Sequence, residues 1–402
     1  MLFLRESKKI LFSLTFLVYL VAVIAMYYVQ FQGDCVEPLR APFPNEDDYG
    51  LTAKEIPELL MPAATQSLVR NYLDNSYTAY PIGFYKNVRL NEDKKQKMAD
   101  IITELSGLES EQLDVLTSQE EGGYEISIPL ALTYERFREL MREADQLIGG
   151  GSDYSDDNIV SHFSRVPKTY EDALAEYEAF LNEDQVTNAY ARLYCDYMGI
   201  VLAILPVFPA VSLAAADRKA RMAQLIHFRK ISSARLIFTR FSALVIMMLI
   251  PVAITAIFAQ ATVTKLYPNQ SIDTAAIFKY AAAWLIPSVM TSTAAGLLIT
   301  ELTSSMLAIF AQVAWWFVGI FTSIDDLTGN IGKFQLVMRH NSLNDLDVFM
   351  DTYDAFVFNR VFFAAISLAA IAVTALIYEQ KRRGNFHEIH IRFKGSGNKS
   401  ET

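Results

Sequence analysis

The sequence ILFSLTFLVYLVAVIAMYYV, residues Ile10–Val29, decides the fold because its twenty residues include no charge. This is about the length at which an α-helix crosses the hydrocarbon core of a membrane. Arg5, Lys8 and Lys9 precede it, and cytoplasmic flanks collect such basic residues. The sequence therefore predicts a first membrane span that starts inside the cell. The alternative is a cleaved signal peptide, because the small residues at 22–25 lie close to an apolar run.

Five further apolar segments follow in a chain that is 52% hydrophobic, with a mean hydropathy of +0.20. We expect a kink in the first of them, because Pro206 and Pro209 remove backbone donors from a spanning helix. Neighbouring helices should then satisfy the freed carbonyl groups. Spans two to six are predicted at about 195–216, 241–263, 275–300, 305–324 and 359–378.

Lysine and arginine sort to alternate sides of these segments, and this sorting predicts the orientation. Under the positive-inside rule, both chain ends are cytoplasmic. The sequence thus predicts a polytopic α-helical protein of the inner or plasma membrane, with six transmembrane helices. Its expected parts are the N-terminus 1–9, helix 1 at 10–32, an extracytoplasmic domain 33–194, helix 2 at 195–216, a cytoplasmic loop 217–240, helices 3–5 at 241–324, an extracytoplasmic loop 325–358, helix 6 at 359–378 and a cytoplasmic tail 379–402.

The predicted extracytoplasmic domain is acidic, with 31 Asp and Glu against 14 Lys and Arg. Its pattern predicts a mixed α/β fold. Helices are expected at 91–105, 133–148 and 170–181, with Gly107 and the three glycines from 149 as stops and Thr133 and Thr169 as caps. Alternation of apolar and polar residues predicts a strand at 124–130. A last helix from about residue 185 is expected to run into the second span.

Two cysteines, Cys35 and Cys195, flank this domain. The predicted topology puts both at the outer membrane surface, where an oxidising compartment permits a disulfide. Spacing alone leaves two alternatives open, a disulfide or a pair of free thiols.

No catalytic or cofactor pattern is present in the sequence. The glycines at 149–151 lack the GxxxxGK[ST] pattern that cradles phosphates, and His387 and His390 have the wrong spacing for an HExxH zinc site. No basic patch with interleaved aromatics suggests nucleic-acid binding. Ionisable residues are nearly absent from the predicted spans, with Asp217, Glu301 and Arg360 at boundaries. The chain is therefore predicted not to be an enzyme, and any transport would take its energy from elsewhere.

The polar residues within the predicted spans include Gln260, Gln312 and the run Thr291–Thr293. Helix packing is the favoured role of the threonine run, ahead of contact with a substrate.

The loop 217–240 carries seven Lys or Arg and one Asp, with apolar residues at near-helical intervals. This pattern is typical of an amphipathic helix at the inner membrane surface. A second interpretation is a coupling helix that docks into a cytosolic ATPase.

The layout of one span, a large outer domain and five more spans resembles the ABC-2 type permeases, the membrane subunits of a class of ATP-binding-cassette exporters. Two stretches carry the resemblance: DRKARMAQLIHFRKISSAR from Asp217 to Arg235, and Asn359–Arg360 opening the last span with YEQKRRG closing it. The loop lacks the glycine and proline common in the family. The amphipathic segment that often precedes the first span is reduced here to residues 1–9.

The resemblance implies an exporter permease that works as a dimer, with a second copy or a sister permease, in the lipid bilayer. ATP and magnesium would bind to separate cytosolic ATPase subunits, and this chain would bind no cofactor. The implied coupling residues, from the acidic residue through the serine–arginine turn to the basic start of the third span, are Asp217, Arg218, Arg221, Arg229, Lys230, Ser232, Ser233, Arg235 and Arg240.

The alternative hypothesis is a membrane sensor or scaffold that reads an extracellular ligand through residues 33–194. Its motivation is the size of that domain. The short basic tail 379–402 argues against it, because a receptor would more usually carry a substantial cytosolic output domain. The identity of the exported substrate is open under the first hypothesis.

Overall fold

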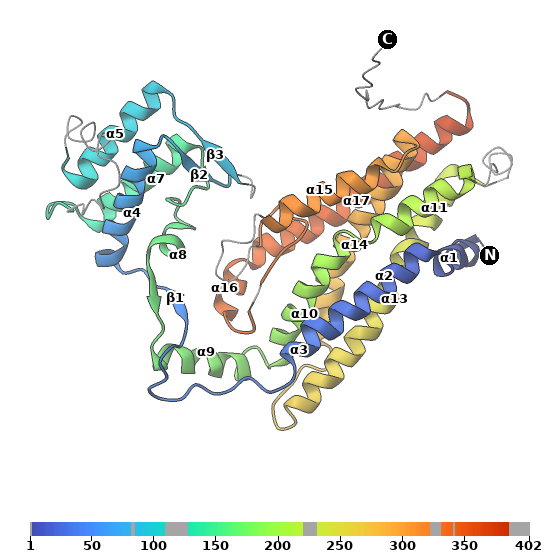
Figure 1. The fold of residues 1–402 in the computed structure, drawn as a ribbon, viewed down its shortest axis with the longest axis horizontal. Helices are drawn as coiled ribbons and strands as arrows, with labels where there is room; N and C mark the ends of the chain where they lie inside the picture. The colour runs from blue at the N-terminus through green and yellow to red at the C-terminus, as the bar shows by residue number, and fades with distance from the viewer. Residues whose placement is uncertain are drawn as a thin grey trace, which may run out of the picture. The chain divides into compact units, whose positions relative to one another are not determined.

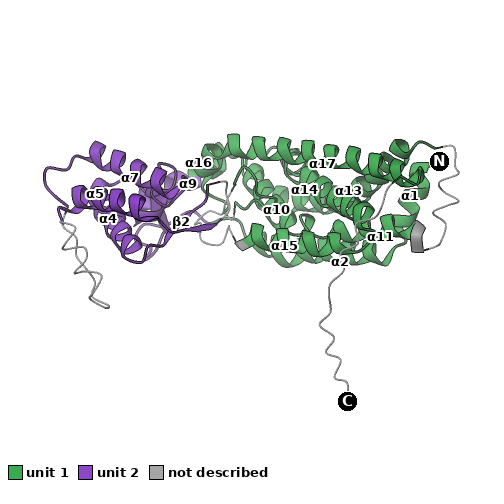
Figure 2. Cartoon of the chain, turned by 90° about the horizontal axis from the view of Figure 1, so that it is seen from above, with its two compact units in different colours: residues 1–39, 178–402 green, residues 40–177 purple. Residues whose placement is uncertain are grey.

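The computed structural model describes residues 2–81, 85–108, 128–219, 231–321, 331–340 and 342–385. The chain divides into two compact units (Figure 2): a helical unit of residues 1–39 and 178–402, and a smaller unit of residues 40–177. The compact part of the predicted outer domain is thus 40–177, and residues 178–194 belong to the helical unit.

Within its described residues, the helical unit contains five helical stretches that are long and apolar enough to cross a membrane. They are Leu14–Asp34, Thr187–Ala216, Ser233–Leu266, Ala276–Thr303 and Tyr353–Arg382. The chain therefore has the character of a multi-pass helical membrane protein. The helices of this unit are α1 (Leu2–Leu11), α2 (Leu14–Met26), a π-helical turn Tyr27–Phe31, α3 (Gln32–Asp34), α10 (Thr187–Leu202), α11 (Val207–Lys219), α13 (Ser233–Leu266), α14 (Ala276–Thr303), α15 (Leu307–Phe321), α16 (Leu346–Asp351) and α17 (Tyr353–Arg382).

The segment predicted as the fifth span is α15, which is shorter than the five candidates. The end of the predicted span, 322–324, lies outside the described residues. Glu301, expected to open the turn before this helix, instead lies in the last turn of α14 and is buried. The turn itself begins at Ser304, which has a left-handed φ of 53°.

The first span differs from the prediction because a separate helix, α1, precedes it. The backbone is interrupted after Leu11, and the Ser13 hydroxyl accepts a hydrogen bond from Phe16 N (3.2 Å), which caps α2. The residues counted as a charged flank thus form an amphipathic helix. Glu6 and Ile10 are on its buried face.

The kink predicted at Pro206 is confirmed as a break between α10 and α11 (Figure 1). Neighbouring side chains satisfy the carbonyl groups that it frees, as expected. Gln312 Nε2 donates to the carbonyl of Ala203 (2.6 Å), and Trp316 Nε1 donates to that of Ile200 (2.8 Å). Both donors lie on α15, so these two hydrogen bonds hold α15 against the end of α10.

Helix α14 contacts α10, α11, α13, α15 and α17 and forms the centre of the helical unit. A Cβ atom at Gly296 would lie 2.8 Å from that of Ala210, so glycine permits the close approach of α14 to α11. Thr291 Oγ1 lies 3.0 Å from Ser367 Oγ on α17, and Ser292 Oγ donates to the carbonyl of Ile204 (3.4 Å). The first two residues of the Thr291–Thr293 run therefore contact neighbouring helices.

The described residues of the smaller unit pack four helices around one apolar core, with two short antiparallel strand pairs. In these pairs, β1 (Leu51–Ala53) lies against β4 (Arg165–Pro167), and β2 (Tyr77–Ala79) lies against β3 (Lys86–Val88). The core helices are α4 (Pro57–Leu73), α5 (Glu92–Ser106), α7 (Tyr134–Ile148) and α8 (Ile159–Phe163). This arrangement confirms a mixed α and β composition, although α4 was not predicted.

Three of the predicted helices are confirmed with their caps. Asn91 accepts from Lys94 N (3.1 Å) at the start of α5, and Gly107 ends it at a φ of 69°. Thr133 caps α7 in the same way. Helix α9 (Tyr170–Asn182) begins with a reciprocal box, in which Thr169 N donates to Asp172 Oδ2 and Asp172 N donates to Thr169 Oγ1.

The other predictions for the first outer segment have mixed outcomes. Residues 124–127 of the predicted strand lie outside the described residues, and 128–130 are not in a strand. The helix expected from about residue 185 is α10, which begins at Thr187 and continues to the break after Leu202.

In the predicted loop 325–358, the described helix is α16, and α17 starts at Tyr353, earlier than the predicted sixth span.

Candidate functional site

The predicted coupling loop is only partly within the described residues. Asp217 and Arg218 lie in the last turns of α11, and their side chains are outside the described part of the structure. Arg221, Arg229 and Lys230 also lie outside the described residues. The structure places Ser232, Ser233, Arg235 and Arg240 together at the start of α13.

The serine–arginine turn is a helix N-cap. Ser232 has an extended backbone, and its hydroxyl accepts a hydrogen bond from Arg235 N (3.3 Å). Serine suits this position because its side chain satisfies a backbone N–H that has no partner in the first helical turn. The Arg235 side chain is exposed. The turn therefore fixes where α13 begins and presents a cation to solvent.

Arg240 forms a buried ion pair with the N-terminal helix. Its Nε lies 3.3 Å from Glu6 Oε2, and Lys9 Nζ on α1 lies 3.0 Å from Glu6 Oε1. Arg240 is 2% exposed and Glu6 is 4% exposed. The attraction between the Glu6 carboxylate and these two cations offsets the cost of removing the buried charges from water. This contact fixes α1 against α13, and no local pattern in the chain predicts that these two residues pair.

The start of α13 is also bound to the end of α17. Ser233 Oγ donates to Glu379 Oε2 (2.5 Å), and Arg383 Nε donates to Glu379 Oε1 (2.9 Å). Arg382 Nη1 donates to the carbonyl of Ile231, just before the cap (2.8 Å). The residues that close α17 therefore bind both the backbone and a side chain at the end of the coupling loop.

A second ion pair binds the end of α14 to α17. Lys381 Nζ lies 3.7 Å from Glu301 Oε2 and donates to Ser304 Oγ in the following turn (3.1 Å). We name the residues that join these four helices the basic-end cluster: Glu6, Ser233, Arg240, Glu301, Glu379 and Lys381.

The basic-end cluster lies where α13 begins, beside α1 and the end of α17. Its bonds link α13 to α1 and α17, and α17 to α14. A force applied to the start of α13 would therefore be passed directly to α1 and α17, and through α17 to the end of α14. The arrangement is suited to transmitting displacement, because ion pairs and packed helix ends hold discrete positions rather than deform continuously.

A separate polar cluster lies around the first turns of α10, and the sequence analysis missed it. The Arg192 guanidinium donates to both oxygens of Asp184, at 2.7 Å for Nη1, and lies 5.0 Å from the centre of the Phe349 ring. Arg192 and Asp184 are 0% and 3% exposed. We name Asp184, Arg192, Asp196, Arg339, His340 and Phe349 the α10 cluster.

Asp196 holds the segment before α16 against α10. Its carboxylate accepts hydrogen bonds from Arg339 Nε (2.9 and 3.0 Å) and from His340 N (2.8 Å). Burial, reinforced by the Arg192 cation, lowers the pKa of His340 to about 4. The imidazole is therefore neutral near pH 7, and its ring contacts Phe349 at 5.5 Å between centres.

Arg360 and Asn359, the residues that the resemblance placed at the opening of the last span, bind each other and two neighbouring segments. Arg360 Nη1 donates to the carbonyl of Trp284 and to Ser288 Oγ, both at 2.8 Å, and Nε donates to Asn359 Oδ1 (3.0 Å). Asn359 Nδ2 donates to the carbonyl of Gln335 (2.8 Å). Helix α17 begins at Tyr353, before the predicted start of the last span, and Arg360 is buried within it. Its place at a span boundary stays a prediction.

Cys35 and Cys195 are both buried and free in the structure. The second of the two alternatives, a pair of free thiols, is therefore the one that the structure contains.

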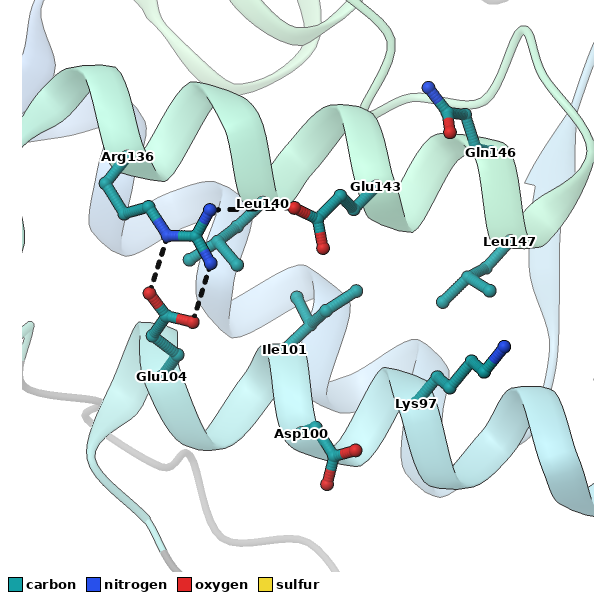
Figure 3. Close-up of a pocket in the computed structure, with 9 residues that line it drawn as sticks. All are labelled: Lys97, Asp100, Ile101, Glu104, Arg136, Leu140, Glu143, Gln146 and Leu147. Carbon is teal, nitrogen blue, oxygen red and sulfur yellow. Dashed lines mark hydrogen bonds and ion pairs between the residues drawn. The ribbon is translucent and has the colours of Figure 1, made fainter.

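The smaller unit has an open pocket between α5 and α7 (Figure 3). Arg136 crosses it, donating to Glu104 through Nε (2.6 Å) and Nη2 (2.9 Å), and its Nη1 lies 3.6 Å from Glu143. The Arg136 guanidinium holds the pKa of the Glu104 carboxyl below its usual value. Lys97 and Asp100 also line the pocket. Three carboxylates and two cations line the pocket and leave one net negative charge, so it does not favour anionic ligands.

No family model, curated protein or solved structure matches this chain.

Proposed function

We propose that the chain is the permease subunit of an ABC-2 type exporter. The observation that carries this proposal is the basic-end cluster, which joins four helices at the end of the loop predicted to dock into an ATPase. A coupling loop is useful only if its movement reaches the membrane helices. The contacts of Ser233, Arg240 and Ile231 provide that connection.

The proposed topology has six spans with both chain ends in the cytoplasm. Five of these spans are the long apolar helices. The remaining one, fifth in chain order, begins with α15. The basic-end cluster would then lie at the cytoplasmic surface of the cell membrane, and residues 40–177 would lie outside. This orientation follows from the basic residues of 1–9, 217–240 and 379–402.

In the proposed mechanism, ATP binding closes two partner ATPase subunits against the loop between α11 and α13. The start of α13 moves with them, and α1, α14 and α17 follow through their ion pairs. Two permease chains would open a path for the substrate outward or out of the bilayer. ATP and magnesium would remain on the partner, and this chain would supply the path and the coupling.

Reversing the charge of the loop should break this connection. The triple variant Arg229→Glu, Lys230→Glu and Arg235→Glu is expected to retain at most about one tenth of the ATPase partner, because we expect the basic loop to dock on acidic groups that the new carboxylates would repel. ATP hydrolysis in the purified complex should no longer be coupled to transport. Quantitative mass spectrometry of the partner and ATPase assays measure these effects.

A matched control reverses three exposed cations of the smaller unit, Lys86, Arg89 and Lys97. The control changes the net charge equally and should retain the partner. Equal retention in both triple variants, with normal membrane insertion, would remove the coupling role from the loop.

A further inference from the structure

A small pocket among α1, α13 and α17 has an excess of positive charge. Four cations line it, Arg5, Lys9, Arg240 and Arg382, against the single carboxylate of Glu6. Glu6 neutralises part of this charge through Lys9 and Arg240. Arg5 is exposed and has no ion-pair partner among the residues that the structure describes. The pocket therefore retains three positive charges in excess and favours an anion.

The position of the pocket indicates where that anion comes from. It lies where α13 begins and α17 ends, and both helices are long and apolar enough to cross a membrane. The ends of such helices lie at the level of lipid headgroups. Basic pockets between membrane helices bind anionic headgroups.

The remaining lining is apolar, which suits an amphiphile better than a small soluble anion. Leu236 and Tyr378 form part of the wall. Beside the pocket, α1 and the residues after it expose Leu4, Leu11 and Phe12, at 64%, 48% and 83%. These side chains would enter the hydrocarbon boundary of a bilayer, so a lipid could reach the pocket from the side.

We propose that this pocket binds the phosphate group of an anionic phospholipid. The phosphate would contact Arg5 on α1 and Arg382 on α17, with Arg240 behind them. Bound lipid would add a bridge between α1 and α17, which are joined in the structure through α13. This inference does not depend on the proposed function, because it concerns the bilayer and not an ATPase.

Thermal unfolding of the purified full chain in neutral detergent tests this proposal. Dioleoyl phosphatidylglycerol should raise the unfolding temperature, and phosphatidylcholine at the same concentration should have a much smaller effect. Arg5→Gln should raise the phosphatidylglycerol concentration needed for half of the shift by about fivefold, the usual contribution of one cation near an anionic surface. Lys8→Gln is the matched control, because Lys8 is exposed on the same helix and does not line the pocket.

Three results would overturn the proposal. Equal stabilisation by both lipids would exclude a preference for anionic headgroups. Equal weakening by Arg5→Gln and Lys8→Gln would indicate attraction to the whole basic surface rather than to the pocket. Inorganic phosphate that reproduces the full shift at the lipid concentration would identify a site for a soluble anion. Native mass spectrometry, which counts retained lipid, should show phosphatidylglycerol lost from Arg5→Gln and kept by Lys8→Gln.

Discussion

Replacing Arg192 by Met is expected to destabilise the helical unit by about 3–5 kcal/mol, because it leaves a buried carboxylate without its cation. Asp184 is 3% exposed, and both of its oxygens accept hydrogen bonds from Arg192. The substitution also removes the cation from the face of the Phe349 ring. Thermal and denaturant unfolding of the purified chain would measure the loss.

The control for this prediction is Lys279→Met, which breaks the exposed ion pair between Lys279 and Asp273 (2.6 Å). Exposed pairs contribute about 0–1 kcal/mol, so this variant should be close to the parent. Adding Asp184→Leu to Arg192→Met should restore much of the stability, since apolar replacement of a whole buried pair is often neutral. Similar losses in the Lys279 and Arg192 variants would contradict the assigned role of the buried pair.

Arg360→Lys is expected to cost about 3 kcal/mol, although the charge is kept, because several hydrogen bonds from a charged group are lost together. The guanidinium reaches the Trp284 carbonyl, Ser288 and Asn359 at once through its planar fork. A lysine ammonium is a single point and cannot reproduce that geometry. Unfolding of this variant in detergent measures the effect.

Arg383→Lys is the control for Arg360→Lys. Its side chain is 63% exposed and pairs with Glu379 one helical turn earlier. The same change of chemistry at the surface should alter stability by only a few tenths of a kcal/mol. Comparable losses at the two positions would show that the buried fork of Arg360 does not join α17 to α14.

The sequence was sufficient where a signal is local. Uncharged apolar runs identified the long helices, and the break at Pro206 followed from the missing donor of proline. The caps at Thr133 and Thr169 were also readable, because a capping residue and its partner lie within one helical turn. The Ser232 cap is a local signal of the same kind. Its position was predicted from the resemblance to a family motif and not from its capping chemistry.

Contacts between distant segments could not be predicted in the same way. Nothing near Glu6 in the sequence indicates that it pairs with Arg240, and nothing near Asp184 points to a buried charge. Arg192 and Asp196 do carry one signal: they are charged residues within a largely apolar helix that continues into a span. The predicted second span began at 195, which left Arg192 outside it and put Asp196 at its edge, so that signal was missed. Helix α4 was missed because its hydrophobic pattern has no clear periodicity and Pro62 interrupts it.

The polar contacts of the helical unit divide into two regions. The α10 cluster contains a buried ion pair and a neutral histidine, which are suited to holding α10 and the segment before α16 in place. The basic-end cluster contains ion pairs among four helix ends beside a loop, which are suited to transmitting movement. The proposed lipid site lies within this second region, so a bound anionic lipid would stabilise the position of α1 there.

The most direct test of the central claim is purification of the tagged chain from its native host in mild detergent, with mass spectrometry of the proteins that accompany it. The account predicts a stoichiometric cytosolic protein with a phosphate-binding loop, and ATP hydrolysis by the complex. A chain that purifies alone, or with a kinase or regulator and without ATPase activity, would contradict the permease proposal and favour a sensor that reads an external ligand through residues 33–194.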